Sequence, residues 1–433
     1  MNNIEGKVVE LYTDVKKSEQ IQSTSLPQKR ITVLDALRGF ALLGVILIHM
    51  LQRFGIRSIP SAPVDPRFPA IDEIIQWIGQ NIIIGRFINI FAFLFGLSFF
   101  IQMDSAAKKG IDFRKRFVWR MFLLLMLGLI THSFYSLEIL SVYAVFGLLM
   151  MALYPVKNWV LITIACLLLL GAPRMIQANI NNRALPVQTA SPINNSITQA
   201  PPVVPQHIAN PSFFNSAKYN YEERFTGKLN YQLGMVGRGY VTFAIFLLGL
   251  VVGRLRFFEE VSIKKKRNMV LFLGFVFAAF LISWIQSIIP AVETRALFNP
   301  AGTYISNTLL MVKALEDINL VIFSGALAMG FTILYQTKMI GKYLDRLSPY
   351  GRMGLTNYIM QGLIGCLLFS MWAFSSTFGG WGPTELFALG IVIYVTQIVF
   401  SKYWLKYFLY GPLEWLWRSA TYLKVQPFRK TRS

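Results

Sequence analysis

The chain has 433 residues, of which 54% are hydrophobic and 15% are charged, and its mean hydropathy is +0.49. Soluble proteins keep about a quarter of their residues charged, so this composition excludes an ordinary soluble enzyme and indicates an integral membrane protein. The net charge of +21 comes from basic residues in short loops between apolar segments, as in the cytoplasmic loops of membrane proteins. This distribution argues against nucleic-acid binding.

Residues 1–33 form a polar segment, which predicts a cytoplasmic N-terminal tail without a cleavable signal peptide. Ten apolar segments follow, and each is long enough to approach the roughly 20 residues that a membrane helix needs. They lie near residues 34–52, 77–103, 117–133, 138–154, 158–173, 238–257, 268–290, 318–336, 353–375 and 384–401. The sequence therefore predicts an all-α polytopic membrane helical bundle, with five helices within 34–173 and five within 238–401.

Basic residues alternate between the loops in a way that supports ten helices. Loops 104–116 and 254–267 carry five and six Lys or Arg residues, whereas 131–137 and 375–383 carry none. With ten helices and a cytoplasmic N-terminus, every basic loop lies on the cytoplasmic side, as the positive-inside rule requires. We therefore predict a protein of the plasma membrane with both termini in the cytoplasm.

Two further segments are predicted to lie outside the membrane. Residues 174–237 are rich in Asn, Pro, Gln, Ser and Thr, which predicts a long and partly disordered external loop. Its more aromatic second half is expected to fold back on the bundle, and His207 is expected to be inert. Residues 402–433 alternate aromatic and basic side chains, a pattern typical of an interfacial amphipathic helix. A short eleventh crossing by this tail stays open as an alternative.

Ionisable and strongly polar side chains in membrane helices are costly and usually face a partner or a cavity, so they are the candidate site residues. Asp35 and Arg38 are three residues apart and are expected to form an ion pair. His49 follows Arg38 by eleven residues, which places both on one helix face about 16 Å apart along the axis. The other candidates, for substrate or donor binding, are Arg86, Asn89, Glu138, Asn357 and Gln361.

Each candidate also has a structural interpretation. The ion pair of Asp35 and Arg38 could serve the fold alone, with Arg38 extending to water. Asn357 and Gln361 could form hydrogen bonds between helices, and His49 could be a packing histidine. The two cysteines lie in separate apolar segments, so no metal site is expected.

Several motifs resemble one bacterial family. The segments are RITVLDALRGFALLGVILIHM, GRFINIFAFLFGLSFFIQ, LEILSVYAVFGLL, SPYGRMGLTNYIMQGLI and GPLEWLWRSATY. They occur in the order seen in the YeiB family, the bacterial domain of unknown function 418, and cover most of residues 31–423 outside the external loop. This resemblance implies a multi-pass membrane protein and gives little information on activity.

The first helix is also similar to the start of membrane acyltransferases of the acyltransferase-three and heparan-alpha-glucosaminide N-acetyltransferase types. The acyltransferase-three pattern has an Asp-x-Leu-Arg motif and a histidine eleven residues after the arginine. In this chain those positions are Asp35, Leu37, Arg38 and His49. The resemblance implies functional roles for Arg38 and His49, although YeiB-family members more often carry asparagine at the histidine position.

Histidine is the usual general base for acyl transfer near neutral pH. The leading hypothesis is therefore an integral membrane acyltransferase with His49 as its base. It would move an acyl group from cytoplasmic acyl-CoA, for example acetyl-CoA, to an envelope glycan, a lipid or a small exported molecule. The expected partners are the lipid bilayer, the acyl-CoA donor and the envelope acceptor, and no bound cofactor is expected.

Two alternatives stay open. One is a transporter or exporter of a small amphiphilic molecule, and the other is a non-catalytic membrane component. Transport sites usually come with broken helices and internal repeats, and the sequence shows neither.

Overall fold

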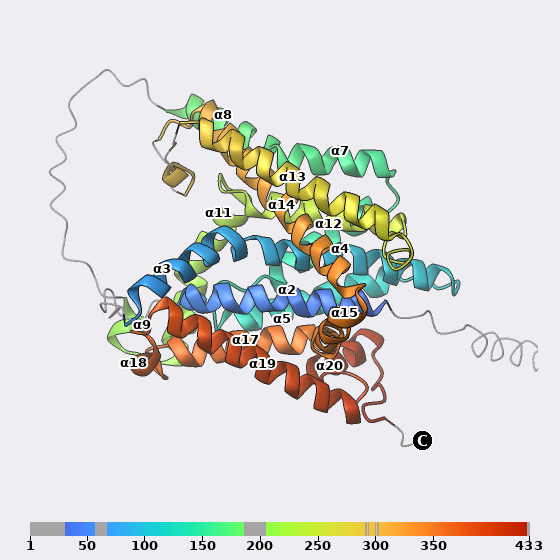
Figure 1. The fold of residues 1–433 in the computed structure, drawn as a ribbon. Coiled ribbons are helices and arrows are strands. Elements are labelled where there is room, and N and C mark those ends of the chain that lie inside the picture. Colours follow the sequence, from blue (N-terminus) through green and yellow to red (C-terminus); the bar gives the residue numbers. More distant parts are fainter. Residues whose placement is uncertain are drawn as a thin grey trace, which may run out of the picture. The chain divides into compact units, whose positions relative to one another are not determined.

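The computed structural model describes residues 31–56, 67–185, 205–290, 292, 294–298, 300 and 303–430. Residues 1–30 of the predicted N-terminal tail lie outside this range. The described residues form helices joined by short connections, with one isolated β-bridge between Phe408 and Arg429. One compact unit spans Val33–Ser433, and Figure 1 shows its helices. The predicted all-α helical bundle is confirmed.

A helix is present at each of the ten predicted positions. These helices are α2 (Thr32–Leu51), α4 (Arg86–Ala107), α5 (Arg114–His132), α6 (Leu140–Leu153), α7 (Asn158–Leu169), α12 (Arg238–Arg254), α13 (Lys265–Ile288), α14 (Asn307–Tyr335), α17 (Gly354–Phe369) and α19 (Pro383–Tyr407). The shorter helices are α3 (Pro69–Ile78), α8 (Ala172–Ala184), α9 (Gln206–Ala209), α10 (Phe213–Tyr219), α11 (Phe225–Leu233), α15 (Lys338–Leu344), α16 (Ser348–Arg352), α18 (Ser375–Phe378) and α20 (Pro412–Tyr422).

Among the described residues, five helices are long and apolar enough to cross a membrane, or up to seven spans if each of two bent helix pairs counts as one. These helices indicate a membrane protein, while the number ten, the plasma membrane and the cytoplasmic termini stay predictions. Helix α2 is an interior helix, because 72% of its most apolar 18-residue stretch is buried within the protein. The corresponding share for α13 is 11%. The exposed Phe277, Phe280 and Trp284 of α13 suit contact with lipid.

Helices α4 and α12 pack with their backbones in close contact, which explains a glycine in each. A Cβ atom on Gly96 of α4 would lie 2.2 Å from the carbonyl oxygen of Phe246, and one on Gly249 of α12 would lie 2.3 Å from that of Phe93. No larger residue fits at these positions without moving a helix. This contact fixes α4, which carries much of the cavity described below.

Two bent helix pairs correct the expectation that broken helices are absent. Helices α7 and α8 meet at 44°, and the segment Phe213–Leu233 meets α12 at 56°. Gly171 and Gly237 precede the second helix of each pair with φ of +78° and +66°, a conformation that glycine adopts at little cost. The polar composition of 174–237 hid these helices, because Asn, Gln and Pro are typical of loops.

Residues 205–233, here called the cap, contact the bundle and contain the helices α9, α10 and α11. His132 donates a hydrogen bond from Nε2 to the carbonyl oxygen of Asn220 at 3.0 Å, and the Tyr221 hydroxyl donates to that of Leu129 at 2.5 Å. His207 is not an isolated loop residue, because its ring is buried and stacks on Tyr219 with centroids 3.9 Å apart. Residues 186–204 of the predicted loop lie outside the described residues.

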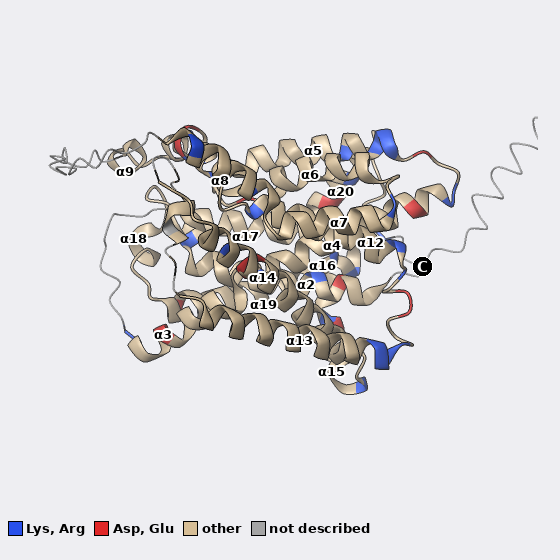
Figure 2. Ribbon diagram, turned by 90° about the horizontal axis from the view of Figure 1, so that it is seen from above, with Lys and Arg blue, Asp and Glu red and all other residues tan. Residues whose placement is uncertain are grey.

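The C-terminal segment differs from the predicted tail in two ways. Helix α19 continues to Tyr407, past the predicted end at 401, and α20 is a separate helix. Helix α20 packs on the bundle, since Trp119 Nε1 of α5 donates to the carbonyl oxygen of Ala420 at 3.0 Å. Figure 2 shows Lys and Arg gathered where α12 ends and α13 and α15 begin, opposite the ends near α3 and α18.

Candidate functional site

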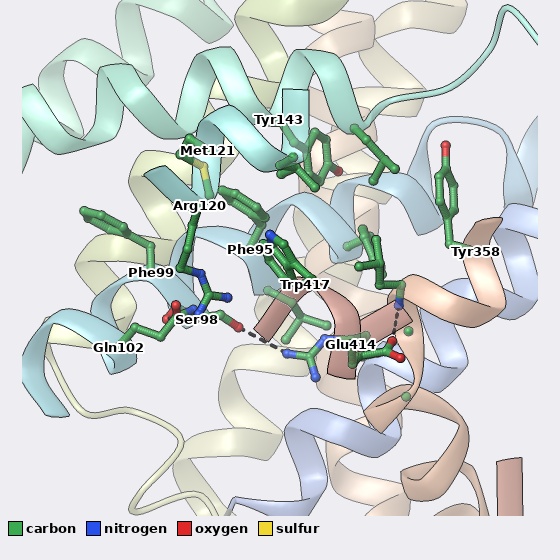
Figure 3. Close-up of a pocket in the computed structure, with 18 of the residues that line it drawn as sticks. Phe95, Ser98, Phe99, Gln102, Arg120, Met121, Tyr143, Tyr358, Glu414 and Trp417 are labelled. Carbon is green, nitrogen blue, oxygen red and sulfur yellow. Dashed lines mark hydrogen bonds between the residues drawn. The ribbon is translucent and has the colours of Figure 1, made fainter. Parts of the chain in front are cut away.

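A cavity of about 240 Å³ lies between α4, α5, α6, α17 and α20, with α2 and α16 completing its wall (Figure 3). Most of its wall is apolar. The apolar lining includes Phe91, Leu94, Phe95, Phe99, Phe117 and Leu124. Arg38, Arg120 and Arg352 also line it, so the cavity combines an apolar interior with a cluster of arginines.

Arg38 is held in place from two sides. Its Nη1 donates to Asp35 Oδ1 at 3.0 Å and its Nη2 donates to Ser98 Oγ of α4 at 3.1 Å. The predicted ion pair between Asp35 and Arg38 is therefore present. Because the guanidinium lines the cavity, the pair can also orient Arg38 toward a bound ligand.

Arg120 is a cation that the protein does not neutralise locally. Among the described residues, no carboxylate oxygen lies within 4.0 Å of its guanidinium, and its buried Nε has no hydrogen-bond partner. Its guanidinium carbon lies 4.3 Å from the ring centroid of Trp417, a cation–π contact that leaves the charge available. Figure 3 shows Arg120 beside Ser98 and Gln102. This arrangement suits an anionic group of a ligand.

Glu414 is the carboxylate of the cavity wall, and its hydrogen bonds are committed to α17. It accepts from the backbone nitrogens of Leu355 and Thr356 at 2.8 and 3.0 Å and from Thr356 Oγ1 at 2.5 Å. Burial raises the pKa of Glu414, and these hydrogen bonds oppose the rise. Glu414 thus caps the first turn of α17 and fixes α20 against it.

Two tyrosines close the end of the cavity that faces His49. Tyr143 donates to the carbonyl oxygen of Ile88 at 3.4 Å, and Tyr358 accepts a hydrogen bond from the backbone nitrogen of Ile139 at 3.1 Å. Behind Tyr358 stands Tyr135, with ring centroids 6.5 Å apart. These tyrosines and their hydrogen-bond partners come from α4, α6, α17 and the connection between α5 and α6.

His49 lies beyond this aromatic layer and does not line the cavity. Its side chain is buried, with ring centroids 5.1 Å from Phe54 and 6.2 Å from Tyr135. Its Nδ1 has no hydrogen-bond partner. Arg38 therefore lines the cavity, whereas His49 is separated from it by Tyr135 and Tyr358. The role of His49 as a base stays a prediction.

Arg86 and Asn89 lie outside the cavity. Arg86 donates to the carbonyl oxygens of Gln80 and Ile84 at 3.1 and 3.3 Å. Asn89 is buried, donates to Ser324 Oγ at 3.2 Å and accepts a hydrogen bond from Arg238. These contacts join α4 to α12 and α14, and a role in ligand binding stays a prediction.

Asn357 and Gln361 belong to a buried hydrogen-bond network between α16, α17 and α19. Asn357 Nδ2 donates to the carbonyl oxygen of Tyr350 and to Ser401 Oγ, both at 3.0 Å. Gln361 Nε2 donates to the Tyr350 hydroxyl at 2.7 Å and to Gln397 Oε1 at 3.3 Å. Asn357 and Gln361 therefore form hydrogen bonds between helices, which was the structural interpretation of these two residues. Neither residue lines the cavity.

Glu138 lies in a separate buried cluster. It does not line the cavity, although Leu140, two residues further along the chain, does. Its carboxylate contacts Lys228, Ser141 and His132. The cavity also contains residues that were not among the predicted site residues, namely Arg120, Arg352, Trp417, Tyr143 and Tyr358. Arg120 had a usable signal, since it is a basic residue inside an apolar segment, whereas the tyrosines are indistinguishable from packing residues without the fold.

Comparison with known proteins finds a family that part of the chain resembles. Residues 252–424 match a family model described as "Protein of unknown function (DUF418)". This part of the chain is similar to that family and is here called the DUF418 segment. The DUF418 segment supplies Arg352, Glu414 and Trp417 to the cavity, while Arg38 and Arg120 come from the N-terminal half.

Relatives extend the similarity beyond the DUF418 segment. The chain is 27% identical over 404 residues to an "Uncharacterized 39.9 kDa protein in amylase 3'region" of Bacillus acidopullulyticus, covering 92% of this chain and 96% of the relative. It is 26% identical over 432 residues to the "Uncharacterized protein YxaH" of Bacillus subtilis (strain 168), covering 94% and 98%. A 77-residue stretch is 43% identical to the "Uncharacterized protein YeiB" of Escherichia coli (strain K12), covering 18% and 19%. None of these names states an activity.

Proposed function

We propose that this protein is a membrane acyltransferase that receives the acyl end of an acyl-CoA donor in the cavity beside Arg38 and Arg120. The observation that carries the proposal is the combination of an apolar interior with the unneutralised charge of Arg120. An acyl thioester on pantetheine is a long and weakly polar chain attached to phosphates. Apolar walls suit the chain, and guanidinium groups suit the phosphates.

The size of the cavity limits which part of the donor it can hold. A volume of about 240 Å³ is below the roughly 300–1,000 Å³ typical of sites that enclose a drug-sized ligand. The cavity would therefore take the acyl-pantetheine end with the adjoining phosphates at its arginines, and leave the adenosine outside, near the basic ends of the helices. Transfer to an envelope acceptor, with His49 as base, requires the Tyr358 and Tyr135 side chains to turn aside.

Donor binding is tested with purified protein in detergent and a non-hydrolysable acyl-CoA analogue. Arg120→Gln should weaken binding by roughly tenfold to a hundredfold, because a charge-assisted hydrogen bond contributes about 1.5–3 kcal/mol. Arg67→Gln is the control, since Arg67 pairs with Glu385 and does not line the cavity. Wild-type protein that does not bind the analogue, or equal losses in both variants, would contradict the proposal.

The role of His49 is tested by turnover of acyl-CoA at matched expression. Loss of a general base costs about 10²–10⁴-fold in rate, so both His49→Ala and His49→Asn should be inactive while retaining normal abundance. Asparagine keeps hydrogen bonding but takes up no proton near neutral pH. Full activity of His49→Asn would show that His49 is not the base.

The two bent helix pairs favour export of a small amphiphilic molecule as a second function. Broken helices near the centre of the membrane are common in transporters, and the described part of the chain has two bends of more than 40°. Counterflow of a labelled amphiphile in proteoliposomes, without acyl-CoA turnover, would favour export over acyl transfer.

A further inference from the structure

A fully buried carboxylate lies in the connection between α5 and α6, and it does not line the cavity. The Glu138 side chain has 0% of its surface exposed. Its Oε2 accepts a hydrogen bond from the backbone nitrogen of Ser141 at 3.1 Å, and its Oε1 accepts one from Ser141 Oγ at 2.5 Å. A buried charge of this kind is stable only with a cation or additional donors beside it.

The cation beside Glu138 comes from the cap and not from the bundle. Lys228 of α11, 9% exposed, makes an ion pair with Glu138 Oε1 and donates to Ser141 Oγ at 2.9 Å. Further cap contacts to the bundle include Arg224, which donates to the carbonyl oxygen of Gly55 at 2.5 Å. The counter-ion of Glu138 is therefore carried by the cap and not by a helix of the bundle.

His132 supplies a third acceptor at the same place. Its side chain is fully buried, and Nε2 lies 3.0 Å from the carbonyl oxygen of Asn220, so this nitrogen carries the proton. Nδ1 is then the acceptor nitrogen. It has no hydrogen-bond partner and lies 3.9 Å from Glu138 Oε1, the oxygen that also contacts Lys228.

These groups match the requirements of one kind of ligand group. A primary ammonium has three N–H donors and no acceptor. Glu138 offers a carboxylate, Ser141 a hydroxyl oxygen and His132 an unpartnered ring nitrogen. A quaternary ammonium would gain the charge interaction but no hydrogen bond, and an anion would be repelled by the carboxylate.

We propose that Glu138, Ser141 and His132 form a binding site for the primary ammonium group of a ligand, and that Lys228 of the cap occupies this site when no ligand is bound. The site goes beyond the proposed acyl transfer and does not depend on it. It adjoins the cavity, because the backbone nitrogen of Ile139 in the same turn donates to Tyr358 of the cavity wall. Displacement of Lys228 by a ligand amine would release the cap at that contact.

The experiment is a chemical rescue of Lys228→Ala, followed by thermal unfolding of the purified protein in detergent. Lys228→Ala should unfold at a lower temperature than wild type. Methylammonium or ethylammonium chloride should raise that temperature in a saturable way, whereas tetramethylammonium chloride at equal ionic strength should not. In wild type, methylammonium should act only at higher concentration, because it competes with Lys228 for the site, and it should there speed protease cleavage of the cap. The double variant Glu138→Gln/Lys228→Ala should lose the rescue.

Two further variants keep the test decisive. Lys218→Ala removes an exposed cap lysine whose nearest carboxylate, Glu222, is 3.9 Å away, and it should neither lower the unfolding temperature nor respond to amines. If Lys228→Ala does not fold, Lys228→Met keeps most of the side-chain volume, and protection of the cap from protease by methylammonium replaces the thermal readout. Unchanged stability of the Lys228 variant, no amine effect, or equal effects of methylammonium and tetramethylammonium would each overturn the proposal.

Discussion

At the scale of single residues, the sequence was most informative where spacing alone sets a contact. The ion pair between Asp35 and Arg38 follows from an i,i+3 spacing and is present at 3.0 Å. The cavity was not predictable in the same way, because its residues come from seven helices far apart in the chain. A tyrosine such as Tyr358 has the same sequence context whether it closes a cavity or fills a core.

The ion pair leads to a prediction about abundance. Asp35→Ala removes the carboxylate partner of Arg38, whose side chain is 24% exposed. The hydrogen bond to the Ser98 hydroxyl remains. Breaking such a pair destabilises the fold, and a loss of about 1–2 kcal/mol lowers cellular abundance several-fold. Quantitative immunoblotting of membranes should show this loss, with partial recovery in Asp35→Ala/Arg38→Ala. Glu222→Ala, from an exposed pair with Lys218 at 3.9 Å, should have no effect. Equal abundance of Asp35→Ala and wild type would mean that water solvates Arg38 sufficiently.

At the scale of helices, apolar length predicted where the helices lie, and two physical effects limited the rest. Helix ends depend on caps formed by distant residues, as Glu414 does for α17. The cap helices are polar and short, and most of their stability comes from contacts with the bundle rather than from helix propensity. Composition alone therefore predicted a loop for them.

The close contact between α4 and α12 predicts a strong size limit at Gly96. Gly96→Val would place atoms against the backbone of Phe246, and overpacking of this kind costs about 1–3 kcal/mol or more. The purified variant should unfold at a lower temperature in detergent. Gly274→Val on α13 is the matched control, because a Cβ there meets no atom within 4 Å. Similar effects of both substitutions would show that the α4–α12 contact is looser than described.

The cap also predicts a pH response centred on His207. Burial, and next the charge of Arg224, lower the pKa of His207 from its ordinary value of 6.5. The docked cap therefore binds fewer protons than the released cap, so its docking is strongest above pH 6.5 and weakens as the pH falls through that value. Hydrogen exchange of residues 205–219 should be faster at pH 5.5 than at pH 7.5, after correction for intrinsic rates. His207→Gln should reduce this difference, and an unchanged difference would assign the response to another group.

At the scale of the whole molecule, the charge pattern gives a prediction that the fold makes more specific. Lys109 lies in the basic connection between α4 and α5, and Gly380 lies in the connection before α19 that lacks basic residues. Seven of the ten predicted helices lie between these two positions, so the ten-helix topology places them on opposite sides of the membrane.

The predicted topology is tested by thiol labelling in intact cells, in a variant in which Cys166 and Cys366 are replaced by serine. Lys109→Cys should resist an impermeant maleimide until the membrane is permeabilised, because the positive-inside rule places basic loops in the cytoplasm. Gly380→Cys should be labelled without permeabilisation, and a Cβ at that position meets no atom within 4 Å. Lys265→Cys, at the start of α13, provides an independent cytoplasmic position between the two. If Lys265→Cys is labelled in intact cells while Lys109→Cys is protected, an odd number of crossings separates them. The ten-helix topology, which has an even number of crossings between residues 109 and 265, would then be wrong in this part of the chain.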